Sequence, residues 1–231
     1  MASSSARFAR IMVVGAGGQL GTDLLRALAD WNPVGLTHAE VSIEDPHSVR
    51  AALDVHRPDL VINTAAFHNV PVCEHEPMRA LEINAVGVGA LARACAERDC
   101  VFATFSTDYV FDGLKGAPYI EDDKPRPINA YGLSKLAGEL IVQSVAPQHL
   151  IFRTSGLFGR VGSKSKGYTF IDRIFANRDR CRSADGRQRH DLFAILYAGR
   201  GCCGARRRSA RRFRFVPYRE CRLMYVVRVC A

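Results

Sequence analysis

The 231-residue chain has no long apolar run. No stretch approaches the roughly 18 apolar residues that a membrane-spanning helix requires. The opening segment, MASSSARFAR, lacks the apolar core of a secretory signal. We therefore expect a cytoplasmic protein with no membrane partner.

Cysteines in metal-binding spacing are also missing. Cys73, Cys95 and Cys100 are the cysteines that precede residue 181, and their spacing fits no metal-binding motif. Buried thiols are the simpler interpretation. We therefore expect no metal site.

Lysine is absent from residues 181–231, and acidic residues are few there. This segment has 13 arginines and three acids, whereas residues 1–180 have 19 basic and 20 acidic side chains. The net charge of +9 therefore belongs to the C-terminal segment alone. The nearly neutral body gives no reason to expect a nucleic-acid partner.

What is present is a regular alternation of short apolar runs and helical patterns. The predicted strands are 8–14, 33–36, 60–62, 101–105 and 150–152, and the predicted helices are 19–29, 45–56, 76–97 and 130–145. This alternation predicts an α/β fold with a Rossmann-like, doubly wound parallel sheet and helices on both faces. It stops near residue 178, so residues 1–178 are predicted to form one domain.

A glycine-rich segment, GAGGQLG, follows the first predicted strand and opens the first predicted helix. Gly15, Gly18 and Gly21 are spaced as in dinucleotide-binding turns. Gly15 permits the tight turn, Gly18 lets the backbone approach a pyrophosphate, and Gly21 lets the helix pack closely on the sheet. The helix N-terminus offers N–H groups to the phosphates. This context favours dinucleotide binding over a plain turn.

The acid that commonly binds the ribose hydroxyls of NAD is displaced from its usual place after the second strand. The segment reads Gly35-Leu-Thr-His38, with Glu40 as the nearest acid and no arginine. We therefore expect either NADPH or NADH as the cofactor.

Tyr131 and Lys135 form a Y-x-x-x-K pair on the last predicted helix, where a spacing of four puts both side chains on one face. An ammonium near the phenol would stabilise the phenolate and lower the tyrosine pKa. Tyr131 could then exchange a proton with a carbonyl oxygen while a hydride is transferred. The pair alone also arises by chance in many helices.

The segment STDYVFDG begins at Ser106, just past the fourth predicted strand. It therefore lies at the carboxyl edge of the sheet, where α/β proteins place their sites. The Thr107 hydroxyl could bond a substrate carbonyl and stabilise a developing alkoxide. A lone S-T-D segment would usually be a turn or helix cap.

With these three motifs in order, residues 10 to 178 resemble extended short-chain dehydrogenases/reductases, and more closely the dTDP-4-dehydrorhamnose reductase family. Supporting segments are NTAA at 63–66, INA at 83–85, EDD at 121–123 and RTS at 153–155. The chain departs from the family pattern at Ser42, Pro71 and Gly156. The resemblance implies an NAD(P)-binding Rossmann domain at residues 1–178.

The resemblance also implies roles for individual residues. Thr107, Tyr131 and Lys135 would be catalytic, and Asp108 with Thr107 would face the substrate. The residues that would line the cofactor are Gly15, Gly18, Gln19, Leu20, Gly21, Ala65, Ala66, Phe67, Tyr131 and Lys135.

Residues 179–231 lack the landmarks of the family's substrate domain. Shifting the reading frame permits VVNDMTFSPSYTRDV from residues 186–200 and FHIANAGSCTWYEFA from residues 216–230, which restores two landmarks in the expected order. We therefore interpret this segment as out-of-frame substrate-domain sequence rather than a disordered basic tail or a nucleic-acid-binding arm. The substrate domain is then missing or aberrant.

The implied activity is NAD(P)H-dependent reduction of a nucleotide-linked 4-keto-6-deoxy sugar, with dTDP-4-dehydrorhamnose converted to dTDP-L-rhamnose. The implied partners are the nucleotide-sugar substrate and a second copy in a homodimer. We expect this chain to be inactive or poorly active without the substrate domain. The alternative is a non-catalytic NADP-binding regulatory subunit resembling the β subunit of methionine adenosyltransferase. The complete Thr107, Tyr131 and Lys135 set favours the enzyme.

Overall fold

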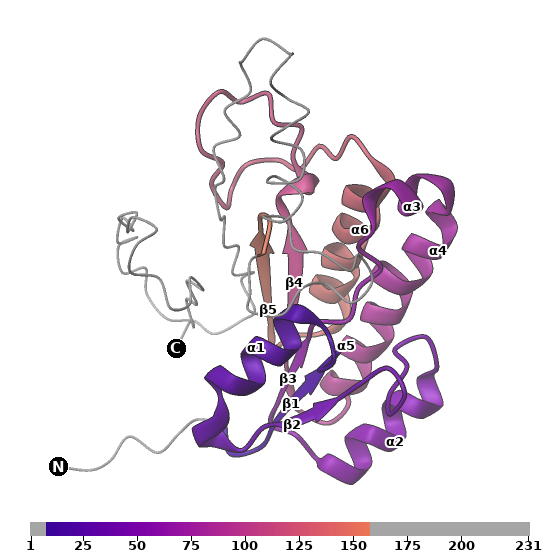
Figure 1. Ribbon diagram of the computed structural model, residues 1–231, viewed down its shortest axis with the longest axis vertical. Helices are drawn as coiled ribbons and strands as arrows, with labels where there is room; N and C mark the ends of the chain where they lie inside the picture. Colours follow the sequence, from indigo (N-terminus) through magenta and orange to yellow (C-terminus); the bar gives the residue numbers. More distant parts are fainter. Residues whose placement is uncertain (1–7, 158–231) are drawn as a thin grey trace, which may run out of the picture.

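The computed structural model describes residues 8–157, so the predictions for residues 158–231 lie outside the described residues. Five parallel strands form one sheet in the order β2-β1-β3-β4-β5 (Figure 1). The strands are β1 (Ile11–Val14), β2 (Val34–Leu36), β3 (Leu60–Asn63), β4 (Val101–Thr107) and β5 (His149–Thr154). Because β2 and β3 lie on opposite sides of β1, the strand order reverses beside β1. Such switch points are where open α/β sheets bind ligands.

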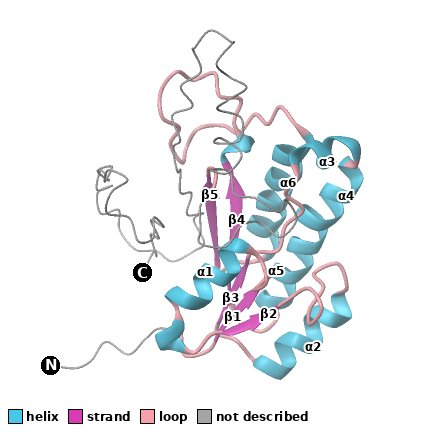
Figure 2. Ribbon diagram, in the orientation of Figure 1, coloured by secondary structure: helices cyan, strands magenta, loops and turns pink. Residues whose placement is uncertain are grey.

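Helices cover both faces of this sheet, as the sequence predicts (Figure 2). They are α1 (Gln19–Ala27), α2 (Pro46–His56), α3 (Val70–His75), α4 (Pro77–Leu81), α5 (Val88–Ala96) and α6 (Ala130–Val145). Shorter turns are η1 (Ala29–Trp31), η2 (Glu82–Gly87) and η3 (Asp108–Val110). The α/β fold and the parallel Rossmann-like sheet are confirmed.

Alternate strand residues face two separate apolar layers. Met12 and Val14 of β1 pack with α2, α5 and α6, whereas Ile11 and Val13 pack on the other face with α1. This two-residue period is what a pleated strand imposes. Since both faces are covered, the strands read as nearly continuous apolar runs, which is typical of parallel sheets.

The helix predicted at 76–97 is confirmed as an unbroken helical run from Pro77 to Ala96. It consists of α4, the π-helical turn η2 and α5, and the sequence does not predict the π-helical turn. The helix predicted from Asp45 is confirmed, because its carboxylate accepts from His47 N at 2.9 Å and caps α2. The short helix α3 is not anticipated by the sequence patterns.

The structure also bears on the expected burial of the cysteines and on the search for membrane-spanning helices. Cys73, Cys95 and Cys100 are buried, as expected. Among residues 8–157, no helix has the length and apolar character needed to cross a membrane.

Candidate active site

The β1–α1 turn is built around Gly15. Its φ of +82° is a conformation that side-chain-bearing residues rarely adopt. A Cβ on Gly15 would lie 2.7 Å from the backbone nitrogen of Ala65, so the β3 loop also requires glycine here. The N–H groups of Gly15 and Ala16 both donate to Leu36 O, at 2.9 and 3.0 Å, which fixes the turn to the end of β2.

The start of α1 is left open as the sequence predicts. Gly18 is the N-cap, and no side chain caps the helix there. The first N–H groups of a helix have no partner within it, and they carry a partial positive charge. A Cβ on Gly21 would lie 2.4 Å from Gly15 O, so glycine allows the helix to meet the turn. This end of α1 can receive a phosphate group.

The nearest acid after β2 is held by its own turn. The Glu40 carboxylate accepts from Thr37 N and from the Thr37 hydroxyl, both at 2.8 Å. These hydrogen bonds lower the pKa of Glu40. Glu40 therefore acts as an ionised cap of the turn that follows β2.

The loop after β3 forms the opposite wall of the glycine turn. The Thr64 hydroxyl donates to Val14 O at 2.8 Å, and Ala65 N donates to Asn63 Oδ1 at 3.1 Å. Ala65, Ala66 and Phe67 are each partly exposed on this loop. Ala65 thus lies against Gly15, and Ala66 and Phe67 follow it along the same loop.

Asn84 holds this loop in place, although the sequence analysis gave it no role. Its side chain accepts from Phe67 N at 2.9 Å and donates to Phe67 O at 2.8 Å and to Ser134 Oγ at 3.0 Å. Asn84 lies in the π-helical turn η2, a feature frequent at functional sites. One buried amide therefore connects the loop of the candidate cofactor site to α6.

Thr107 ends β4 at the same carboxyl edge. Its hydroxyl accepts from Tyr109 N and donates to Asp108 Oδ1, both at 3.2 Å. Burial raises the pKa of Asp108. A hydroxyl and a carboxyl are thereby placed side by side, as the STDYVFDG motif predicts.

The first turn of α6 is pressed against the segment after β4. A Cβ on Gly132 would lie 2.1 Å from Tyr109 O, so only glycine allows this approach. Asn129 caps the helix by accepting from Gly132 N at 2.7 Å, and Glu74 of α3 accepts from Ala130 N at 2.6 Å. Tyr131, which lies between these anchors, is thus fixed beside Thr107.

Tyr131 is half-buried and makes an edge-on ring contact with Tyr109, with centroids 5.8 Å apart. Burial raises the pKa of Tyr131, although a hydrogen bond with Thr107 opposes the rise. This direction is opposite to the lowering expected from Lys135. The reason is that loss of solvent and the negative charge of Asp108 outweigh the favourable contacts.

Lys135 is buried one helical turn after Tyr131. Burial lowers the pKa of its ammonium to about 8, while the Glu139 carboxylate opposes the change. Tyr131, Lys135 and Glu139 follow one another at intervals of four, so they occupy one face of α6. That spacing was the available signal for Glu139, which the sequence analysis did not single out.

Glu139 forms a buried ion pair with Arg153 of β5. Arg153 Nη2 lies 2.6 Å from Glu139 Oε2, and the two side chains are 4% and 2% exposed. The Ser106 hydroxyl also donates to Glu139, and the guanidinium lies over the Phe111 ring at 5.1 Å. This network joins β4, β5 and α6.

The predicted site residues therefore gather at one edge of the sheet. The glycine turn and the β3 loop form one half, and Thr107, Tyr131 and Lys135 form the other. Gln19 contributes by donating from its side chain to Leu157 O at 3.2 Å, which spans from α1 to the end of β5. Leu20 is buried in the first turn of α1.

The fold and the site define an α/β protein of the extended short-chain dehydrogenase/reductase type. Residues 9–188 match the family described as the RmlD substrate binding domain, and the chain belongs to that family. The matched range runs ten residues past the predicted boundary at 178.

Two proteins named as reductases are similar to about two thirds of this chain. The dTDP-4-dehydrorhamnose reductase of Burkholderia thailandensis is 41% identical over 154 residues, which are 66% of this chain and 52% of that protein. The dTDP-4-keto-6-deoxy-D-glucose reductase of Streptomyces niveus is 42% identical over 156 residues, which are 66% of this chain and 54% of that protein. The chain thus spans about half the length of these relatives.

A solved structure supports the same family. The dTDP-4-dehydrorhamnose reductase of Bacillus anthracis, crystallised in complex with NADP, superimposes with a TM-score of 0.68 at 32% sequence identity. The similarity covers 74% of this chain and 60% of the Bacillus chain.

Proposed function

We propose that this chain is the cofactor-binding part of an NAD(P)H-dependent reductase of a nucleotide-linked 4-keto-6-deoxy sugar. The proposed reaction converts dTDP-4-dehydrorhamnose to dTDP-L-rhamnose. The observation that carries the proposal is the convergence of Thr107, Tyr131 and Lys135 on the edge that also holds the glycine turn. The reductase names of the relatives from Burkholderia and Streptomyces support it.

The proposed cofactor is NADPH or NADH. The uncapped N-terminus of α1 and the close approach allowed by Gly18 and Gly21 fit its pyrophosphate. The Ala65–Phe67 loop would line its other side. The NADP in the Bacillus anthracis structure supports this assignment. The bound nicotinamide would supply a hydride to C4 of the sugar.

In the proposed mechanism, Tyr131 gives its phenolic proton to the C4 oxygen. Its raised pKa keeps the phenol protonated at neutral pH, so the proton is present when it is required. The Thr107 hydroxyl donates to the same oxygen and stabilises the developing negative charge. Lys135 binds the nicotinamide ribose and stabilises the phenolate that remains on Tyr131. Asp108 holds a hydroxyl of the sugar.

We also propose that residues 179–231 are substrate-domain sequence read out of frame. The landmark segments recovered by a shifted frame support this, as does the restriction of the relatives' similarity to about two thirds of the chain. The chain as written would then reduce sugar nucleotides poorly. Well-oriented substrate binding can supply roughly 7–11 kcal/mol of the reaction barrier. A chain without an in-frame substrate domain would lack part of the pocket that orients the sugar. Resequencing codons 172 to 186 tests the idea.

A homodimer in the cytoplasm completes the proposal. Val86 of η2 and Leu133 and Leu140 of α6 are exposed apolar side chains, and Val86 also lines a groove on α5. Arg93 and Glu97 line the same groove, so a two-fold axis could pair unlike charges of two copies. Light scattering should give twice the chain mass, and Leu140→Glu should give a monomer.

The cofactor part of the proposal is tested by fluorescence titration of NADPH and NADH against a chain ending near residue 178. We expect saturable binding by a folded sample. The proposal is wrong if a folded sample binds neither cofactor at millimolar concentration. Restoring the reading frame and supplying dTDP-4-dehydrorhamnose then tests the reductase activity separately.

A further inference from the structure

Two buried thiols lie where α5 ends and β4 begins. Cys95 belongs to the last turn of α5, and Cys100 directly precedes β4. Both side chains belong to the same apolar core cluster. They lie at the opposite end of β4 from Thr107, so the proposed reaction leaves them unused.

The connecting turn brings the two cysteines together. Cys100 N and Arg98 N both donate to Cys95 O at 3.0 Å, and Asp99 closes the turn with a φ of +53°. Ordinary bond lengths then hold the two Cα atoms within roughly 7 Å of each other. The pKa of each thiol depends on the other, so the two side chains lie close together. This spacing is compatible with a disulfide.

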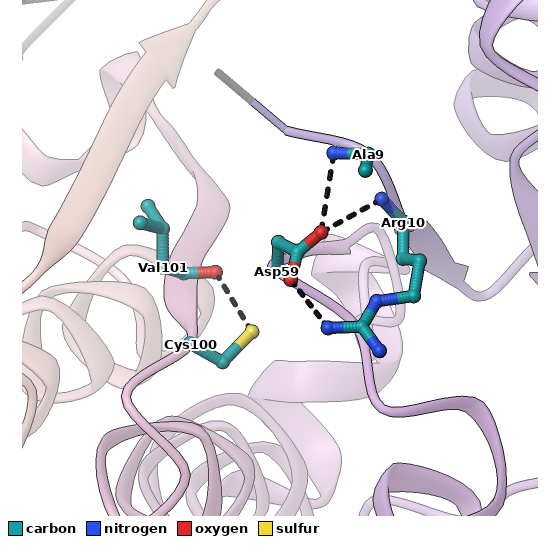
Figure 3. Close-up of polar contacts among 5 residues, drawn as sticks. All are labelled: Ala9, Arg10, Asp59, Cys100 and Val101. Carbon is teal, nitrogen blue, oxygen red and sulfur yellow. Dashed lines mark hydrogen bonds and ion pairs between the residues drawn. The ribbon is translucent and has the colours of Figure 1, made fainter. Parts of the chain in front are cut away.

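Cys100 lies beside a surface ion pair, as Figure 3 shows. Arg10 Nη2 lies 2.7 Å from Asp59 Oδ1, and Ala9 N and Arg10 N donate to Asp59 Oδ2 at 3.1 and 2.9 Å. The Cys100 thiol itself donates to Val101 O, at 3.5 Å.

The two thiols differ in their readiness to ionise. The hydrogen bond from Cys95 lowers the pKa of Cys100, although burial and Asp59 oppose it. The same hydrogen bond, together with burial, raises the pKa of Cys95. Cys100 is therefore the nucleophile of the pair, since the thiolate is the reactive form of cysteine.

We propose that Cys95 and Cys100 are a reversible oxidation site that forms an intramolecular disulfide with a small peroxide as the oxidant. The Cys100 thiolate attacks one peroxide oxygen, which gives a sulfenic acid and releases hydroxide. The Cys95 sulfur then attacks the Cys100 sulfur, its proton leaves with the hydroxyl as water, and the S–S bond forms. In sum, two thiols and one hydrogen peroxide give one disulfide and two waters.

Peptide mapping of the full chain tests the proposal. The folded protein is treated with hydrogen peroxide, remaining thiols are alkylated, and the sample is digested with trypsin. Cleavage after Arg93, Arg98 and Lys115 separates the two cysteines into peptides 94–98 and 99–115. We expect these peptides to be joined, with a mass two hydrogens below their sum, and to separate after reduction with dithiothreitol.

Cys73 is the matched control because it is also buried. We expect the 94–98 and 99–115 peptides to be joined at a peroxide dose that leaves most Cys73 unoxidised and therefore alkylated. Modification of Cys73, Cys95 and Cys100 at one rate would mean that the protein unfolds first, and this would overturn the proposal. The proposal would also be overturned if Cys95 and Cys100 were both recovered as alkylated thiols after peroxide treatment. A sulfinic acid on Cys100 without the joined peptides would overturn it too.

Two variants separate the steps. In Cys95→Ser, Cys100 should stop at the sulfenic acid, which dimedone traps. In Cys100→Ser, Cys95 should stay a free thiol after peroxide treatment and should be recovered alkylated. Oxidation of Cys95 in the second variant would contradict the assignment of Cys100 as nucleophile. The wild-type map decides the proposal even where a variant folds poorly.

Discussion

Glu139 of α6 and Arg153 of β5 form an ion pair that is almost fully buried, with Nη2 and Oε2 2.6 Å apart. Arg153 Nε also donates to both carboxylate oxygens, at 3.0 and 3.2 Å. The pair holds the helix that carries Tyr131 and Lys135 against the strand beside β4. It therefore fixes Tyr131 and Lys135 relative to Thr107 at the end of β4.

Glu139→Gln should destabilise the protein strongly. The substitution leaves the Arg153 guanidinium buried without its counter-charge, and breaking such a pair costs about 3–5 kcal/mol. Urea unfolding measures this free energy. The matched control is Asp54→Asn, which breaks the exposed Arg98–Asp54 pair and should cost less than about 1 kcal/mol. Similar losses in the two variants would contradict the structural role given to Glu139.

Gly15→Ala should strongly weaken cofactor binding. Its φ is +82°, and a Cβ would lie 2.7 Å from Ala65 N, so the turn and the β3 loop must separate. Affinity for NADPH or NADH should fall at least about tenfold, or about 1.4 kcal/mol. Gly113→Ala is the control, because its φ is +76° but nothing lies within 4 Å of the new Cβ. Fluorescence titration should show unchanged affinity for that variant.

Asn84→Ala should weaken both the fold and cofactor binding. It removes the partners of Phe67 N and Phe67 O, and a buried group left without a hydrogen bond costs about 1–3 kcal/mol. Ser134→Ala removes the hydrogen bond from Asn84 and the one to Tyr131 O within α6, but it leaves both Phe67 hydrogen bonds in place, so its loss should be smaller. Equal Tm values for the two variants would show that Asn84 does not hold the loop.

Lys135→Met should stabilise the protein at neutral pH. The pKa of Lys135 is lowered in the folded protein to about 8 from its ordinary value of 10.5, so the unfolded chain binds more protons between these values. Wild-type stability therefore rises with pH through this window. The gain of the variant should be on the order of 3 kcal/mol below pH 8 and should shrink toward pH 10.5. Urea unfolding at pH 7 and pH 10 measures it, and a gain that grows with pH would contradict the burial argument.

The fold could be predicted from local sequence because its strands and helices alternate and each strand is apolar. The turn at Gly15 and the capped start of α2 at Asp45 are set by residues near in sequence. The π-helical turn η2 within the helix at 76–97 could not be predicted. It carries Asn84, which contacts Phe67 and Ser134, and contacts between distant segments leave no local pattern.

The sequence indicated which residues gather at the candidate site, but it did not indicate their electrostatics correctly. The motifs identified Thr107, Tyr131 and Lys135, and the structure brings them to one edge of the sheet. The direction of the Tyr131 pKa was wrong, because burial and the Asp108 charge depend on packing. Glu139 was missed because a single acid on a helix usually faces solvent, whereas here Arg153 neutralises it in the core.

The central claim is that Tyr131 supplies the proton for reduction of a 4-keto sugar. Its most direct test is the single-turnover rate of NADPH oxidation by a frame-restored chain saturated with dTDP-4-dehydrorhamnose, measured for the parent and for Tyr131→Phe. We expect the variant to lose about 10²–10⁴-fold in rate while it binds NADPH as tightly as the parent. A variant that binds NADPH normally and retains the parental rate would contradict the account.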